Sequence, residues 1–189
     1  MQNVDLLETE ECTGQGPHGH PPLPYQAYLY DPPPPCFEML KTRGKLFQEI
    51  ELICFQTFQK LEEKRTKLKN QDLDIFIGIG GGSALDMAKG LSVLYSNDGP
   101  AINYRGFDLF NNPILPVIAI PTTAGTGSEI TPNASFIDTN EKRKMGINGE
   151  AIRPKYAILD PELTLSCPKA PTISAGIDSM VHATEAFVA

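Results

Sequence analysis

The chain has 189 residues, 41% hydrophobic and 21% charged, the balance of a globular protein with room for one domain or for one domain and part of a second. Its net charge of −7 opposes a phosphate backbone and argues against a nucleic-acid partner, so small molecules are the expected ligands. The acidic N-terminus argues against a signal peptide or a mitochondrial presequence, and no apolar run is long enough to cross a bilayer.

The first part of the chain is rich in proline and glycine. Residues 12–35 include a run of four prolines, a composition typical of polyproline II or disorder. We therefore expect residues 1–36 to form a proline-rich disordered arm. The four cysteines lie far apart, without metal-binding spacing, which indicates reduced thiols in a cytoplasmic protein.

From Phe37 to Asn70 apolar residues recur at helical spacing opposite a charged face, which predicts one long amphipathic helix. These apolar positions are Leu46, Ile50, Ile53, Cys54, Phe58 and Leu61.

After this segment, the spacing of apolar residues changes to the pattern of buried strands. Residues 73–79 (LDIFIGI) form a short apolar run that ends at three glycines, residues 83–95 are expected to be helical, and residues 114–120 form a second buried run. Strand, glycine turn, helix and strand predict a βαβ unit with a parallel sheet.

Four later segments are also predicted from the sequence. Residues 134–138 and 144–148 predict a hairpin, residues 155–159 a short strand, and residues 172–189 a helix without a stop signal.

The turn at 80–83 (GGGS) lies between a predicted strand and a predicted helix. Its glycines would let the backbone approach a phosphate, which the free amides at the start of the helix then bind. Asp86 is a candidate contact to a ribose or a nicotinamide amide, or an acidic residue favoured by the helix dipole. Lys89 is a candidate phosphate contact or a solvated lysine. Spacing alone leaves nucleotide binding and a merely tight turn as alternatives.

A second turn, residues 121–129 (PTTAGTGSE), also follows a buried strand. Two turns at the carboxyl ends of adjacent parallel strands border one crevice, where α/β sheets bind ligands. The alternative is a Ser/Thr-rich surface loop.

The final helix carries Asp178 and His182 four residues apart, which places both side chains on one face, and Glu185 continues that face. A carboxylate oxygen and an imidazole suit a divalent transition metal. An ordinary surface ion pair is the alternative.

Taken in order, four motifs closely resemble the iron-containing (group III) alcohol dehydrogenase family over about residues 72–189. They are residues 74–89 (DIFIGIGGGSALDMAK), 121–129, 159–163 (LDPEL) and 176–185 (GIDSMVHATE). The resemblance implies an α/β fold, with an incomplete Rossmann-like parallel-sheet domain over 37–166. The start of an all-helical metal-binding domain follows over 167–189.

The resemblance also implies site residues and cofactors. Gly81, Gly82, Ser83 and Asp86 are expected on the pyrophosphate and nicotinamide side of NAD(P), Thr122, Thr123 and Thr126 along its adenine and phosphate wall, and Lys144 and Leu159 near its ribose. Asp178 and His182 match the first two ligands of Fe²⁺ or of another divalent metal such as Zn²⁺. No catalytic residue is assigned.

Members of the family add two histidines farther along the chain and an earlier strand, so the resemblance implies a truncated chain. One hypothesis is an NAD(P)- and iron-dependent alcohol dehydrogenase, incomplete here, that transfers hydride between a small alcohol or aldehyde and nicotinamide. The other is a catalytically inactive nucleotide-binding or interaction module derived from that family. We expect no nucleic-acid or membrane partner, and a homo-oligomer is compatible with either hypothesis.

Overall fold

The computed structural model describes residues 56–189. The predicted arm over 1–36 and the first part of the predicted long helix lie outside the described residues. In the part of the chain that is described, no helix is both long and apolar enough to cross a membrane.

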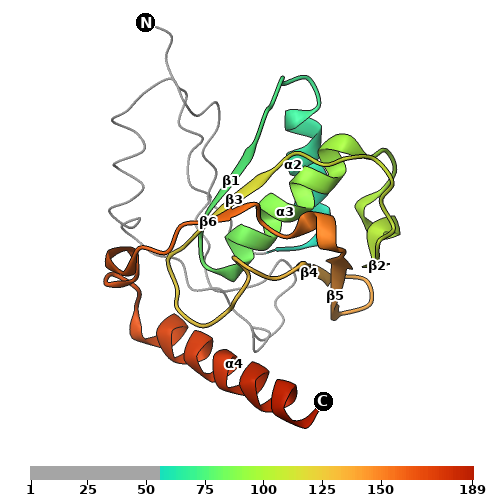
Figure 1. Ribbon diagram of the computed structural model, residues 1–189. Coiled ribbons are helices and arrows are strands. Elements are labelled where there is room, and N and C mark those ends of the chain that lie inside the picture. The colour runs from blue at the N-terminus through green and yellow to red at the C-terminus, as the bar shows by residue number, and fades with distance from the viewer. Residues whose placement is uncertain (1–55) are drawn as a thin grey trace, which may run out of the picture.

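A parallel sheet forms one half of the fold, in the strand order β1-β3-β6. Its strands are β1 (Phe76–Gly80), β3 (Val117–Pro121) and β6 (Tyr156–Ala157). Helix α3 (Gly82–Ser96) connects β1 to β3, which confirms the predicted βαβ unit. Gly80 pairs with Pro121, so β1 and β3 end side by side (Figure 1).

Helix α3 packs directly on one face of this sheet. A Cβ atom added at Gly78 would lie 3.0 Å from Ala88 Cβ and 3.2 Å from Leu85 Cα. A larger residue in β1 would therefore push the helix away, and with it the turn at the helix start.

A second, mixed sheet has the order β2-β5-β4. Its strands are β2 (Gly106–Phe107), β4 (Asn133–Asp138) and β5 (Arg143–Asn148). Strands β4 and β5 are antiparallel, which confirms the predicted hairpin. Asp138 Oδ1 closes the hairpin by accepting hydrogen bonds from the amides of Asn140 (2.9 Å) and Glu141 (3.1 Å).

The predicted continuous helix over 37–70 is wrong at residues 56–57. Helix α2 (Phe58–Leu68) begins after Thr57, whose backbone is extended and whose side chain caps the helix by accepting from the Lys60 amide. The Ile137 amide donates to the Gln56 carbonyl at 2.8 Å, so this stretch pairs with β4 instead of continuing the helix.

The main core lies between α2, α3 and the second sheet. Its fully buried members include Leu61, Met87, Val93, Phe136, Ile147 and Ile152. The rings of Phe58 and Phe136 lie 5.4 Å apart and join α2 to β4.

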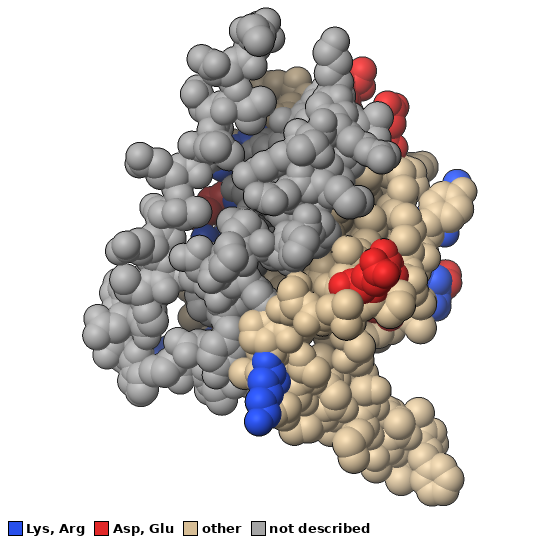
Figure 2. All heavy atoms as spheres, turned by 90° about the vertical axis from the view of Figure 1, so that its left-hand side faces the viewer, with Lys and Arg blue, Asp and Glu red and all other residues tan. Residues whose placement is uncertain are grey.

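Helix α4 (Lys169–Val188) ends the described chain and begins three residues earlier than predicted. It follows the short 3-10 turns η1 (Ala101–Tyr104), η2 (Glu150–Ile152) and η3 (Pro161–Thr164). In Figure 2 it projects from the body, and most of the face turned to the viewer carries no charged side chain. Its exposed apolar residues are Ile173, Ile177, Met180, Val181, Phe187 and Val188.

Candidate functional site

The first glycine turn leads from β1 into an uncapped helix. Gly80 has a φ of +146°, a conformation that favours glycine, and a Cβ there would lie 2.8 Å from Ala84 Cβ. Gly81 is the N-cap residue of α3, and no side chain caps the helix. The first amide to bond within the helix is that of Ala84, which donates to Gly81 at 3.0 Å. The amides of Gly82 and Ser83 precede it and are placed to bind an anion.

The second turn, residues 121–129, lies directly against the first. The Thr122 amide donates to the Gly80 carbonyl at 2.9 Å. A Cβ at Gly81 would lie 3.4 Å from Thr123 Cγ2, and one at Gly82 would lie 3.2 Å from Thr126 Oγ1. The structure therefore brings together the two turns that were predicted to meet at adjacent strand ends.

Thr123 has an unsatisfied hydroxyl at this junction. Its Oγ1 is buried and has no hydrogen-bond partner among the described residues. A buried hydroxyl without a partner carries a free-energy cost that a ligand or a water molecule would remove.

Behind the turns, Lys89 lies at the centre of a buried polar network, so neither sequence-based alternative for it, phosphate contact or solvated side chain, is correct. Its side chain is fully buried. Its ammonium donates to Ser128 Oγ (2.9 Å) and to the carbonyls of Thr131 (3.2 Å) and Asn133 (2.7 Å). It also lies 3.4 Å from Asp86 Oδ1.

Asp86 belongs to the same network and is only 7% exposed. Its Oδ1 accepts from Ser128 Oγ at 2.6 Å, and its Oδ2 accepts from the Ser135 amide at 3.0 Å. The network therefore ties α3 both to the second turn and to β4. Ser128 was not selected from the sequence, because nothing in its own turn signals a contact with residues about 40 positions away.

Burial dominates the electrostatics of this pair. It raises the pKa of the Asp86 carboxyl, while the Lys89 ammonium and the bonds from Ser128 and Ser135 oppose that shift. Burial also lowers the pKa of the Lys89 ammonium, and the Asp86 carboxylate opposes that shift. Each charge thus offsets part of the desolvation cost of the other.

The remaining predicted cofactor contacts, Lys144 and Leu159, lie on β5 and after β6. Lys144 is exposed on β5, and its charge acts to lower the pKa of Asp86. Leu159 is exposed and follows β6, at the same end of the sheet as Gly80 and Pro121. Leu159 therefore lies on the same side of the sheet as the turns, and Lys144 is accessible to solvent on the hairpin.

Asp178 and His182 lie together on α4, as their spacing predicts. His182 Nε2 is 3.8 Å from Asp178 Oδ1, and both side chains are about half exposed. Within residues 56–189, no group of three His, Cys, Asp or Glu residues could hold a metal ion. The described chain thus presents a pair of donors, not a closed metal site.

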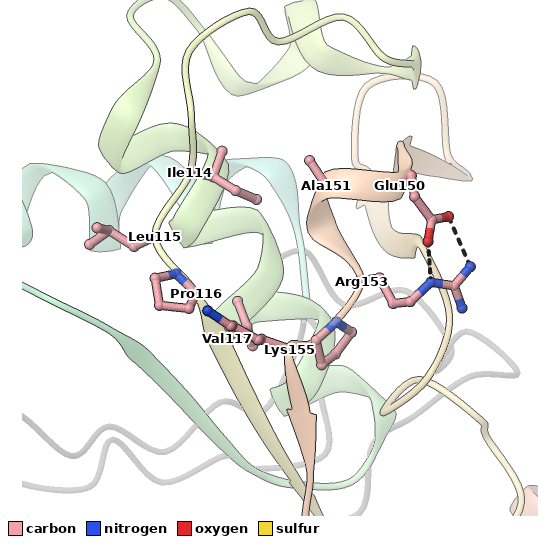
Figure 3. A pocket seen from close by; sticks show the side chains of 9 residues that line it. Ile114, Leu115, Pro116, Val117, Glu150, Ala151, Arg153 and Lys155 are labelled. Carbon is pink, nitrogen blue, oxygen red and sulfur yellow. Dashed lines mark hydrogen bonds and ion pairs between the residues drawn. The ribbon is translucent and has the colours of Figure 1, made fainter.

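A hollow of about 440 Å³ lies at the opposite end of the sheet (Figure 3). Val117 begins β3 and Lys155 precedes β6, and both line it, as do Glu150 and Arg153, which form an ion pair at 2.6 Å. It is far along the strands from the glycine turns and contains none of the predicted site residues.

The parallel sheet, its connecting helix and the paired turns define the protein as a Rossmann-like α/β domain followed by a helix. The sequence model described as "Iron-containing alcohol dehydrogenase" matches residues 44–161. The chain therefore belongs to the iron-containing alcohol dehydrogenase family, whose members are oxidoreductases that use NAD(P) and iron.

Individual relatives agree with this assignment. The chain is 43% identical over 143 residues to a sulfoacetaldehyde reductase of Bilophila wadsworthia, covering 76% of this chain and 36% of that protein. An iron-containing alcohol dehydrogenase of Thermotoga maritima superposes with a TM-score of 0.65 at 34% identity, over 79% of this chain and 41% of that chain. The sulfoacetaldehyde reductase of Bifidobacterium kashiwanohense in complex with NAD⁺ gives 0.58 at 33% identity, over 65% and 33%. The chain thus spans little more than a third of the curated relative's length.

Proposed function

We propose that this chain forms the cofactor-binding part of an NAD(P)-dependent alcohol dehydrogenase and contributes two ligands to its divalent metal. The observation that carries the proposal is the contact between the two glycine turns at the adjacent ends of β1 and β3. This is the position at which α/β sheets bind nucleotides.

The residues at the turns fit a dinucleotide. The uncapped amides of Gly82 and Ser83 suit a pyrophosphate, because a helix N-terminus carries partial positive charge. The absence of a side chain at Gly81 and Gly82 lets a phosphate approach the backbone. The unsatisfied hydroxyl of Thr123 supplies a further donor.

The second turn and the hairpin would complete the pocket. We assign Thr122, Thr123 and Thr126 to the adenine and phosphate wall, and Lys144 and Leu159 to the ribose. We assign Asp86 to the nicotinamide side of the pocket, where Ser128 and Ser135 hold its buried carboxylate in one orientation. The solved relative that holds NAD⁺ supports this choice of cofactor.

Asp178 and His182 fit part of a metal site. A carboxylate and an imidazole 3.8 Å apart on one helix face suit Fe²⁺ or Zn²⁺. A divalent ion held there supplies Lewis-acid polarisation of an alcohol or aldehyde oxygen during hydride transfer to or from nicotinamide. The chain's own contribution is to hold the nicotinamide and the metal ligands on neighbouring elements.

We further propose a division at about residue 166, with the cofactor-binding domain over 37–166 and the start of a helical metal-binding domain over 167–189. A small alcohol or aldehyde is the proposed substrate and the cytoplasm the proposed location. The alternative hypothesis is a nucleotide-binding module without turnover. It has the same cofactor site and differs only in that no hydride transfer takes place.

Calorimetric titration of NADH, and separately of NADPH, into the 189-residue chain, with and without Fe²⁺, tests the proposal alongside an alcohol oxidation assay. Saturable binding together with metal-dependent turnover supports the dehydrogenase. Binding without turnover supports the nucleotide-binding module. Absence of NADH and NADPH binding would overturn both.

A further inference from the structure

The second glycine turn touches the backbone of the helix that carries the metal ligands. Gly125 has a φ of +132°. A Cβ there would lie 2.6 Å from the carbonyl carbon of Ala175 and 3.3 Å from the amide nitrogen of Gly176, and it would overlap the Ala175 oxygen. Only glycine therefore allows this turn and α4 to meet at the observed separation.

The contact coincides with the point at which α4 packs on the body. Among the residues of α4, all of which the structure describes, only Ala175 is buried. The residues that follow it are exposed, and α4 lies beyond the carboxyl ends of β1 and β3 beside the second turn (Figure 1). The position of the helix therefore depends on this contact.

Helix geometry links the contact to the metal pair. Asp178 and His182 follow Ala175 by three and seven residues, so all three lie on one face of α4. The same turn contributes Thr123 and Thr126, which lie against the first glycine turn. A single turn thus contacts the proposed cofactor site on one side and the metal helix on the other.

We infer that Gly125 and Ala175 are positioning residues that set the distance between the metal pair and the bound nicotinamide cofactor. The inference rests on the proposed function and adds to it. Hydride transfer requires reacting atoms about 3–3.5 Å apart. A larger residue at the contact between Gly125 and Ala175 would therefore move the metal pair away from the nicotinamide. Neither residue touches the reacting atoms in this role.

The test measures the separation of α4 from bound NADH by fluorescence. The sequence contains no tryptophan, so Met180→Trp, at an exposed position on α4, introduces a single donor whose emission NADH can accept. In that background, Ala175→Leu enlarges the buried side chain at the point where the α4 backbone meets Gly125, and it leaves the sequence of both turns unchanged. Gly176→Leu is the matched control, because a Cβ there meets nothing within 4 Å.

We expect NADH to quench the tryptophan strongly in the Met180→Trp chain and in its Gly176→Leu derivative. Ala175→Leu should lose much of this quenching while its NADH dissociation constant stays unchanged, and Gly125→Ala should also lose quenching. If alcohol oxidation is detected, Ala175→Leu should lower kcat by about 100-fold at constant NADH affinity. Equal quenching in Ala175→Leu and Gly176→Leu would overturn the inference, although the proposed function would survive. Absence of NADH binding in the Met180→Trp chain and in the unaltered chain would instead overturn both.

Discussion

At the scale of single residues, the buried ion pair of Lys89 and Asp86 bears most directly on the site. The Lys89 ammonium has three hydrogens, and five acceptor atoms surround it, from the four residues Asp86, Ser128, Thr131 and Asn133. Removing either charge would leave the other buried and unpaired, whereas removing both would leave neutral groups of similar shape.

We therefore expect Lys89→Met to lower the free energy of unfolding by about 3–5 kcal/mol. Adding Asp86→Asn should recover part of that loss. The double variant should therefore lose less free energy of unfolding than the sum of the losses in the two single variants. Urea denaturation of all four chains measures this coupling. Lys169→Met, at an exposed position, is the control and should change stability by less than about 0.5 kcal/mol.

The same pair gives a pH dependence. Burial lowers the pKa of Lys89 from its ordinary 10.5. The charges of Asp86 and Glu129 oppose this shift, and the charge of Arg153 adds to it. Between that lowered pKa and 10.5 the unfolded chain binds more protons than the folded one, so stability rises with pH. We expect the stability difference between the native chain and Lys89→Met to increase as the pH rises from that lowered pKa toward 10.5. A difference that stays flat or shrinks in urea titrations would contradict this sign.

At the scale of elements, α3 crosses β4 and α2 where only a glycine fits. A Cβ at Gly90 would lie 2.5 Å from Phe136 Cζ and 3.0 Å from Leu61 Cδ1. Gly90 thus sets how closely the helix that carries the first turn packs on the core. Gly176, also inside a helix, has open space around it.

Gly90→Ala should therefore destabilise the protein by about 1–3 kcal/mol, because overpacking outweighs the gain in helix propensity. Gly176→Ala should be neutral or stabilising by up to about 1 kcal/mol. Thermal or urea unfolding of both variants measures the contrast. Equal effects would show that α3 does not pack as closely on Phe136 as the structure has it.

Elements with local signals could be predicted from the sequence. The buried runs, the glycine turns and the hairpin follow from periodicity and turn residues, and the meeting of the two turns follows from parallel strand pairing. The start of α2 could not be predicted, because Thr57 pairs with Ile137, eighty positions away. The burial of Lys89 and the contact of Gly125 with Ala175 likewise depend on partners distant in the sequence, so no local sequence pattern predicts them.

At the scale of the whole molecule, the described chain combines a packed α/β body with a helix that is mostly exposed. Ile177 and Met180 are 56% and 70% exposed on α4. Apolar side chains grouped on a projecting helix favour association in water.

We expect the 189-residue chain to self-associate with increasing concentration. Replacing Ile177 and Met180 together by lysine should shift the population toward monomer in sedimentation velocity, whereas Lys142→Glu, on the hairpin turn, should not. A chain that remains monomeric at all accessible concentrations would contradict this expectation.

Calorimetry of NADH binding to the native chain and to Gly82→Val tests whether the paired glycine turns bind a dinucleotide. A valine at this position would press on Thr126 and cover the helix amides that the pyrophosphate needs. We predict saturable binding to the native chain, retained in Gly176→Leu and lost in Gly82→Val. Equal binding by the native chain and Gly82→Val, or no binding by the native chain, would show that the paired turns are not a dinucleotide site.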